Sequence, residues 1–191
     1  MVKRKSQKRK LRKISYAVCA EGEKTEIQYL NILKKQNNGI FIKIFSCRRK
    51  TTPEAILNTA KKRLENEEPN EIWLMLDVDD NKSKDFDNLF KWKMENIEKN
   101  HLAISNPCFE FFLLLHYEKP KGQLTIKSCQ GELKRHIPNY DKSTPEGKFS
   151  LERIKEAIKR AEDIESENED IKITERNGST VYKLAKKVIE H

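Results

Sequence analysis

Carboxylates gather directly after two apolar, strand-like stretches of this sequence. They are Glu21, Glu23 and Glu26, which follow residues 14–20, and Asp77, Asp79 and Asp80, which follow residues 71–76. Open α/β sheets bind their ligands at the carboxyl ends of the strands, and divalent cations such as Mg²⁺ take oxygen ligands. The pattern indicates a magnesium site built from several strand ends, although acids at strand ends also serve as helix caps and solvated loop residues.

Strand and helix patterns alternate along the first half of the chain and would position these acids. Strands are predicted at residues 14–20, 40–46, 71–76 and 101–105, and helices at residues 24–35, 52–64, 85–99 and 108–117. The third strand is nearly continuous in apolar residues, which is typical of a strand covered on both faces. Four strand-plus-helix units in succession predict an α/β fold, with a largely parallel four-stranded sheet sandwiched by helices in a Rossmann-type arrangement.

The second half of the chain is predicted to be mostly helical. Proline and glycine residues interrupt the pattern between residues 118 and 150, which predicts an insertion or a small cap. Residues 151–165 and 179–190 are predicted to form a helical C-terminal extension. The whole stretch from residue 14 to residue 191 is therefore interpreted as a single domain.

The composition favours a compact, water-soluble protein. Charged residues make up 36% of the 191 residues, and hydrophobic residues, also 36%, occur in clustered runs. No apolar run approaches the roughly 18 to 20 residues that a membrane span needs, and no secretory signal follows the basic N-terminus. The four cysteines lack CxxC spacing, which favours reduced thiols over a disulfide or a zinc site. A cytoplasmic protein without a membrane partner is expected.

The first 13 residues carry most of the positive charge of the chain. They contain eight of the basic residues and no acid, so the rest of the chain accounts for only one of the nine net positive charges. Such a segment is expected to be flexible and either to aid solubility or to bind phosphate groups of nucleic acid. The candidate nucleic-acid-binding residues are Lys3, Arg4, Lys5, Lys8, Arg9, Lys10, Arg12 and Lys13.

Other polar residues near the strand ends have two interpretations. Lys24 could neutralise phosphate charge or lie on the surface at a helix start. Ser105 and Asn106 follow the fourth strand and could orient a ligand or water, or cap the next helix. Asp80 is a further, weaker candidate ligand.

Two polar residues in the apolar stretch 108–117 also have two interpretations each. Glu110 is either an additional site residue or the partner of a buried base, because an unpaired acid is costly in an apolar helix. His116 is either a hydrogen-bonded core histidine or a catalytic group. Ser179 and Thr180 either cap the last helix or approach phosphate.

The motifs at the two strand ends resemble the Toprim domain that topoisomerases, primases and overcoming-lysogenisation-defect nucleases share. The resemblance lies in a strand that ends in Glu21-Gly22 and in a later strand that ends in Asp77-x-Asp79. Four blocks in order are similar, more closely, to the RloB-like family of bacterial defence proteins. These blocks are CAEGEKTEIQY (19–29), LMLDVDD (74–80), SNPCFE with LLLHY (105–110 and 113–117) and NGSTVY (177–182).

The resemblance implies a metal-dependent site that processes nucleic acid. By similarity, Glu21 is the general acid or base of phosphoryl transfer and also a metal ligand, and Asp77 and Asp79 hold Mg²⁺ or Mn²⁺. Glu26 stands where nuclease-type relatives keep a second acid and would help to hold a second ion. Asn81 replaces the third Asp of the topoisomerase pattern DxDxD, which favours a nuclease-like protein.

The sequence thus leads to three hypotheses about function. The first is a magnesium-dependent Toprim nuclease of an antiviral, abortive-infection system that cleaves RNA, such as tRNA, or DNA and works with an ATPase partner. The second is a non-catalytic nucleic-acid-binding or adaptor subunit that works with an ATPase. The third is a primase-like nucleotidyl transferase, which would consume nucleoside triphosphates.

Overall fold

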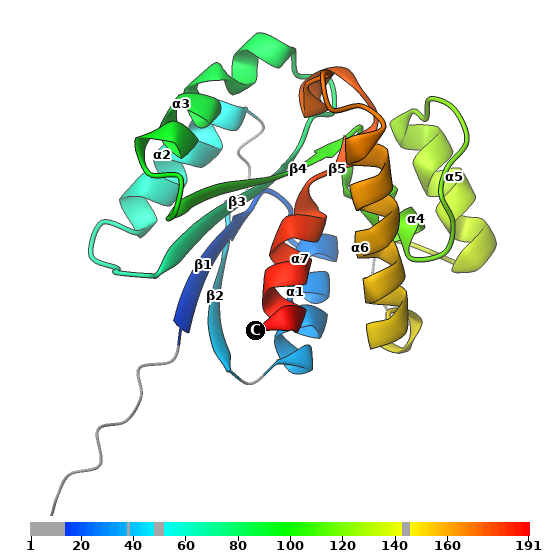
Figure 1. Cartoon of the computed structure of the whole chain (residues 1–191), viewed down its shortest axis with the longest axis horizontal. Helices are drawn as coiled ribbons and strands as arrows, with labels where there is room; N and C mark the ends of the chain where they lie inside the picture. Colours follow the sequence, from blue (N-terminus) through cyan, green and yellow to red (C-terminus); the bar gives the residue numbers. More distant parts are fainter. Residues whose placement is uncertain (1–13, 38, 48–51, 143–145) are drawn as a thin grey trace, which may run out of the picture.

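A five-stranded sheet lies between two layers of helices (Figure 1). The computed structural model describes residues 14–37, 39–47, 52–142 and 146–191. The strands are β1 (Ile14–Ala20), β2 (Ile40–Ser46), β3 (Glu71–Asp77), β4 (Asn100–Asn106) and β5 (Gly178–Ser179), and their order across the sheet is β2-β1-β3-β4-β5. The α/β class is therefore confirmed.

The first four strands are parallel, as the alternating pattern predicts. The fifth strand is antiparallel to β4 and was not predicted. Because β5 has only two residues, it carries no periodicity from which it could be recognised. It attaches the C-terminal part of the chain to the edge of the sheet.

One face of the sheet is covered by α2 (Pro53–Arg63), the 3₁₀ helix η1 (Ser83–Phe86) and α3 (Asp87–Glu95). The predicted start of α2 is confirmed, because the Thr52 hydroxyl accepts a hydrogen bond from the Ala55 amide at 3.3 Å and Pro53 is the first helical residue. Its buried side chains pack with Leu74 and Leu76 of β3.

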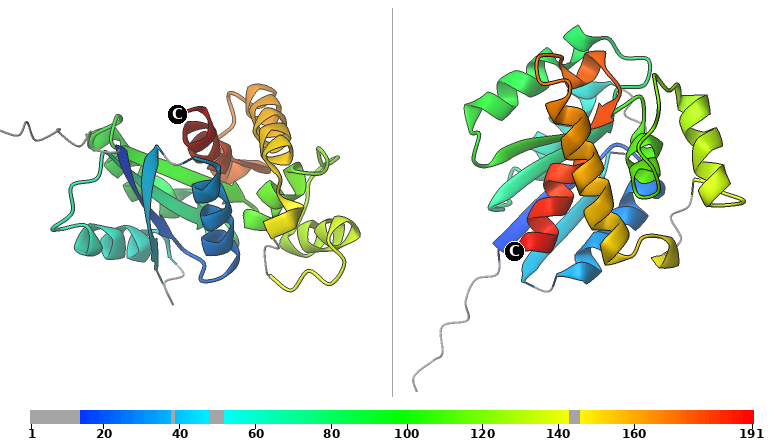
Figure 2. Two further views of the ribbon diagram at one scale, coloured as in Figure 1. Left: turned by 90° about the horizontal axis from the view of Figure 1, so that it is seen from below. Right: turned by 45° about the vertical axis from the view of Figure 1, so that its right-hand side comes forward.

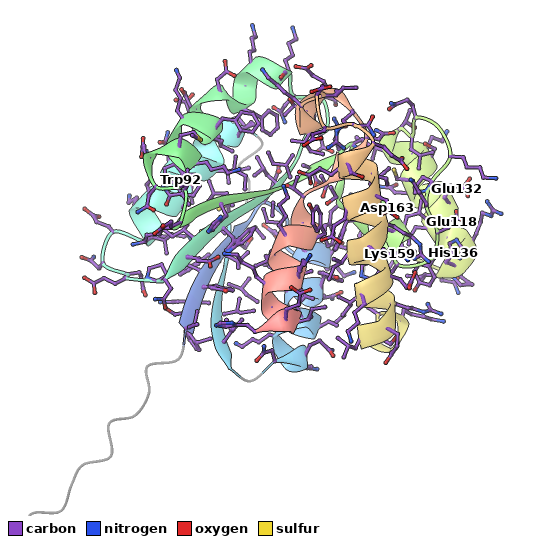
Figure 3. All side chains as sticks on the ribbon, in the orientation of Figure 1. Trp92, Glu118, Glu132, His136, Lys159 and Asp163 are labelled. Carbon is purple, nitrogen blue, oxygen red and sulfur yellow. The ribbon has the colours of Figure 1, made fainter. Side chains whose placement is uncertain are left out.

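The helix predicted at residues 85–99 is shorter than expected. The spacing of its apolar residues predicts a buried face made of Phe86, Leu89, Phe90, Met94 and Ile97, and part of this face is wrong. Met94 and Ile97 are 69% and 60% exposed, whereas Trp92 is buried (labelled in Figure 3). The segment starts as a 3₁₀ helix and then changes to an α-helix, and its buried side chains, Phe86, Leu89 and Trp92, recur every three residues. The helix ends at Asn96, where the backbone becomes extended.

The other face is covered by α1 (Thr25–Gln36), α4 (Phe109–Leu115), α6 (Leu151–Ser166) and α7 (Val181–Glu190). Every residue of α4 is buried, as its apolar sequence predicts. Helix α5 (Ile126–His136) packs on α4 at the side of the molecule, as Figures 1 and 2 show, and its first turn is capped by Thr125. The 3₁₀ turns η2 (Glu146–Lys148) and η3 (Ile173–Glu175) complete the fold.

Cys19, Cys47, Cys108 and Cys129 are buried and not joined by disulfides, in agreement with the prediction from their spacing. In the part of the chain that the structure describes, no helix has both the length and the apolar character to cross a bilayer.

Candidate active site

Glu21 and Asp77 lie in direct contact at the carboxyl edge of the sheet. Strands β1 and β3 are parallel neighbours, with Ala20 opposite Met75. The Glu21 amide extends this ladder by donating to the Met75 carbonyl at 2.9 Å, and the Asp77 amide donates to Glu21 Oε2 at 3.1 Å. Residues separated by 56 positions in the sequence thus share one hydrogen bond, as the sheet order requires.

Asp79 is held beside this pair by an unusual backbone conformation. Its φ angle is +45°, in the left-handed region that residues with a Cβ rarely adopt. Two hydrogen bonds impose this conformation: the Val78 amide donates to the Ser105 carbonyl and the Asp79 amide to the Pro107 carbonyl, each at 2.9 Å. Asp is among the residues that adopt this region most readily, so the turn fixes the position of the Asp79 carboxylate at little cost.

Glu26 reaches the same place from the first turn of α1. Its carboxylate folds over Gly22 so closely that a Cβ at Gly22 would lie 2.1 Å from Glu26 Oε2. The glycine of the Glu21-Gly22 motif therefore leaves room for the Glu26 side chain against the chain that carries Glu21.

Replacing Gly22 by Ala is expected to displace the Glu26 carboxylate while the fold persists, because the clashing atoms are at the end of a flexible side chain. We expect the affinity for Mn²⁺ to fall about 10-fold, as one oxygen ligand is misplaced. Calorimetric titration with Mn²⁺ and thermal unfolding would measure the two effects. An unchanged Mn²⁺ affinity would contradict the placement of Glu26 in the metal site.

Glu110 is the fifth carboxylate of the cluster. It is only 7% exposed, and the Tyr140 hydroxyl donates to its Oε1 at 3.2 Å. No ion pair to Glu110 is present among the described residues, so the alternative of a buried basic partner is not what the structure shows. The side chain instead faces the negative charges of Glu26 and Asp79.

A cavity of about 360 Å³ opens over these acids. Glu26, Asp77 and Glu110 line its acidic side. Lys24, Asp141 and Lys142 line it too. The pocket therefore combines a partly buried acidic floor with charged groups of both signs.

The pKa values of the clustered acids are raised. Burial, together with the charges of Asp79 and Glu26, raises the pKa of Glu21 to about 7, although the hydrogen bond from the Asp77 amide opposes the shift. Burial and then the charges of Glu26, Asp79 and Glu21 raise the pKa of Asp77 well above its ordinary value. The pKa values of Glu26 and Asp79 are also raised, chiefly by burial. Mutual repulsion of this kind is relieved when a cation binds.

The donor set fits a hard divalent cation in its chemistry. All side-chain donors of the cluster are carboxylate oxygens, which Mg²⁺ and Mn²⁺ prefer. Within residues 14–37, 39–47, 52–142 and 146–191, however, no three Asp, Glu, His or Cys side chains already converge on one point. Glu21 accepts from the Asp77 amide through one of its two oxygens, and the Glu26 carboxylate lies over Gly22, so the side chains would have to rearrange before three of them could bind one ion.

Ser105 and Asn106 fix the C-terminal segment to the sheet. The buried Ser105 hydroxyl bonds that of Ser179 at 3.0 Å, and the Asn106 amide group donates to the Ile173 carbonyl at 2.9 Å. Thr180 likewise accepts from the Ile104 amide at 2.8 Å and makes no cap bond to α7. These hydroxyl and amide groups join β4 to β5 and to the η3 turn.

His116 lies in the aromatic core and does not line the pocket. Its Nδ1 is 3.0 Å from the Phe112 carbonyl, which can only accept, so Nδ1 carries the proton and Nε2 accepts from the Tyr29 hydroxyl at 2.9 Å. Burial lowers the pKa of His116 to about 3. The structure thus places His116 as a hydrogen-bonded histidine of the core, the first of the two interpretations.

The remaining candidates lie at the periphery. Asp80 is exposed, and its charge contributes to the raised pKa of Asp79. Lys24 is an exposed rim residue whose Nζ lies 3.6 Å from Asp141 Oδ2. The predicted nucleic-acid contacts at residues 1–13 lie outside the described residues.

Sequence reasoning missed the residues that reach the pocket from the segment after α5. Tyr140, Asp141 and Lys142 all contact or line it. They lie in a stretch interrupted by Pro138 and Pro145, where no periodicity indicates which residues face inward. A lysine in a polar loop cannot be recognised from the sequence as a residue that lines a pocket.

The blocks that contain Glu21, Asp77 and Glu110 thus meet at the carboxyl edge of the sheet, whereas residues 113–117 lie in the core. The family model for RloB-like proteins matches residues 16–188. The chain therefore belongs to the RloB-like family. No curated protein and no solved structure matches the chain significantly.

Proposed function

We propose that this protein is a magnesium-dependent nuclease with a Toprim-like active site. The observation that carries the proposal is the contact between Glu21 and Asp77, with Asp79, Glu26 and Glu110 around them. Raised pKa values at a pocket are typical of sites that bind metal or transfer protons. The five carboxylates outnumber the basic side chains around them, which favours the binding of a metal cation.

Asp77, Asp79 and Glu26 would hold the metal, with Glu110 as a further candidate. A bound Mg²⁺ supplies positive charge to the phosphate and lowers the pKa of a bound water. Glu21, the carboxylate in contact with Asp77, would take the proton of the attacking water. As the water oxygen bonds to phosphorus, the bond to the leaving oxygen breaks, and that oxygen takes up a proton.

The substrate would be an RNA, such as a tRNA, or a DNA. The basic residues 1–13 support a nucleic-acid ligand, because lysine and arginine release counterions from the phosphate backbone. The resemblance to defence proteins supports an antiviral role in abortive infection, with an ATPase partner that controls cleavage.

The proposal is tested by incubating the full-length protein with a tRNA pool and with plasmid DNA. We expect cleavage with Mg²⁺ or Mn²⁺, none with EDTA, and loss of cleavage in Glu21→Gln. The matched control is Asp163→Asn, which changes an exposed carboxylate on α6 (Figure 3). Equal cleavage by wild type and Glu21→Gln would rule out this site assignment.

A non-catalytic binding subunit is the second candidate function. It is favoured by the absence, among the described residues, of three side chains already arranged as metal ligands. In that case Mn²⁺ titration shows no site, and deletion of residues 1–13 removes nucleic-acid binding together with most of its salt dependence. A Mn²⁺ site that is lost in Asp77→Asn would exclude this alternative.

A further inference from the structure

The segment that follows α5, residues 137–142, is fastened to the acidic pocket from outside the sheet. We call it the cap tip. The Tyr140 hydroxyl bonds Glu110, the Thr25 hydroxyl donates to the Lys142 carbonyl at 2.6 Å, and Asp141 lies 3.6 Å from the Lys24 ammonium. Tyr140 and Glu110 are 30 positions apart in the sequence, and Thr25 and Lys142 are 117 positions apart. The cap tip is therefore placed over the pocket by specific contacts with both of its walls.

Lys142 has the least favourable backbone of the cap tip. Its φ angle is +66°, in the left-handed region, where a lysine gains none of the local stabilisation that asparagine finds there. The hydrogen bond from Thr25 to its carbonyl holds this conformation. Such strain is retained where the surroundings impose it, often at functional sites.

The Lys142 ammonium is available for an anion. The side chain is exposed and lines the cavity with Glu26, Asp77 and Glu110. No ion pair of Lys142 within 4.0 Å is present among the described residues. Its charge nevertheless lowers the pKa of Glu26 and of Asp79, which places it within electrostatic reach of both acids. A phosphate held above the carboxylates would meet this cation first.

We propose that Lys142 binds the scissile phosphate of the nucleic acid, with its ammonium against a non-bridging oxygen on the side opposite the acidic floor. The inference rests on the proposed function, because it concerns the same pocket. Five carboxylates carry more negative charge than one or two bound divalent ions neutralise, so a further cation at the pocket would reduce the remaining repulsion of an incoming phosphate. A lysine supplies this as a point charge that tolerates several phosphate orientations.

The experiment compares Lys142→Ala and Lys142→Arg with Lys159→Ala, an exposed lysine on α6 away from the pocket (Figure 3). Binding of a fluorescent single-stranded oligonucleotide is measured with Ca²⁺ at several salt concentrations, and Mn²⁺ affinity is measured separately. For Lys142→Ala we expect weaker oligonucleotide binding and a salt slope reduced by about 0.7, as for one lost phosphate contact. Its Mn²⁺ affinity should be unchanged or higher, because a competing cation is removed.

Lys142→Arg should keep the salt slope, and Lys159→Ala should match the wild type in every measurement. In the cleavage assay, Lys142→Ala should lose about 10- to 100-fold in rate. An unchanged salt slope in Lys142→Ala, or Mn²⁺ binding that weakens with it, would overturn the assignment. If wild type binds the oligonucleotide but cleaves nothing, the nuclease function fails, while the salt slope still decides the role of Lys142.

Discussion

Replacing Asp77 by Asn is expected to abolish Mn²⁺ binding and to reduce cleavage by at least about 1,000-fold. Asp77 lies at the centre of the cluster, and the charges of Glu26, Asp79 and Glu21 all act on it. A metal ion contributes several kcal/mol to the transition state of phosphoryl transfer, and about 4 kcal/mol corresponds to a 1,000-fold change in rate. Calorimetry with Mn²⁺ and single-turnover cleavage would measure the two losses.

The same substitution should leave the metal-free protein at least as stable as the wild type at pH 8. Asparagine keeps an oxygen for the hydrogen bond from the Phe109 amide and removes a charge that burial destabilises. Chemical unfolding with EDTA would measure this, with Asp163→Asn as the matched surface control. A large loss of stability in Asp77→Asn would mean that the carboxylate holds the fold together and that the loss of activity says nothing about metal.

The stability of the metal-free protein should fall as the pH rises from about 5 to about 7, relative to that of Glu21→Gln. The folded-state pKa of Glu21 is raised to about 7 from its ordinary value of 4.5. Between these values the folded state binds more protons than the unfolded state, so stability decreases with increasing pH. For one group the slope is at most about 1.4 kcal/mol per pH unit.

Urea unfolding of wild type and Glu21→Gln at pH 5, 6, 7 and 8 with EDTA would measure the difference. The two proteins should be similar at pH 5, and the variant should be more stable at pH 8. The charges that face Glu21 are those of Asp77, Asp79 and Glu26, so Glu26→Gln should reduce the difference. Saturating Mn²⁺ should reverse the trend, because the metal binds the ionised carboxylates. Parallel pH profiles with EDTA would contradict the raised pKa of Glu21.

The parallel strands and the meeting of Glu21 with Asp77 could be predicted from the sequence. Apolar runs mark buried strands, and the carboxyl ends of parallel strands share one edge. The pairing of β1 with β3 makes these ends adjacent, as the structure shows. Asp79 and Glu26 follow because they lie close in sequence to the two strand ends.

The cap tip and β5 could not be predicted, since their positions depend on contacts between distant parts of the chain. Tyr140 meets Glu110 across 30 residues, and Lys142 meets Thr25 across 117. Neither segment has a hydrophobic periodicity from which the residues that it contacts could be predicted. The apolar face predicted around Met94 and Ile97 was wrong for a different reason. Ile97 lies beyond the end of α3, and within the segment the buried residues Phe86, Leu89 and Trp92 recur every three positions.

The short β5 also sets the order in which the molecule can be completed during translation. Strand β4, whose Ser105 carbonyl shapes the turn at Asp79, is an open sheet edge until Ser179 pairs with it, 74 residues later. A nascent chain on the ribosome therefore exposes this edge of β4 until residues 178–179 are available to pair with it, although every residue that lines the pocket precedes residue 143.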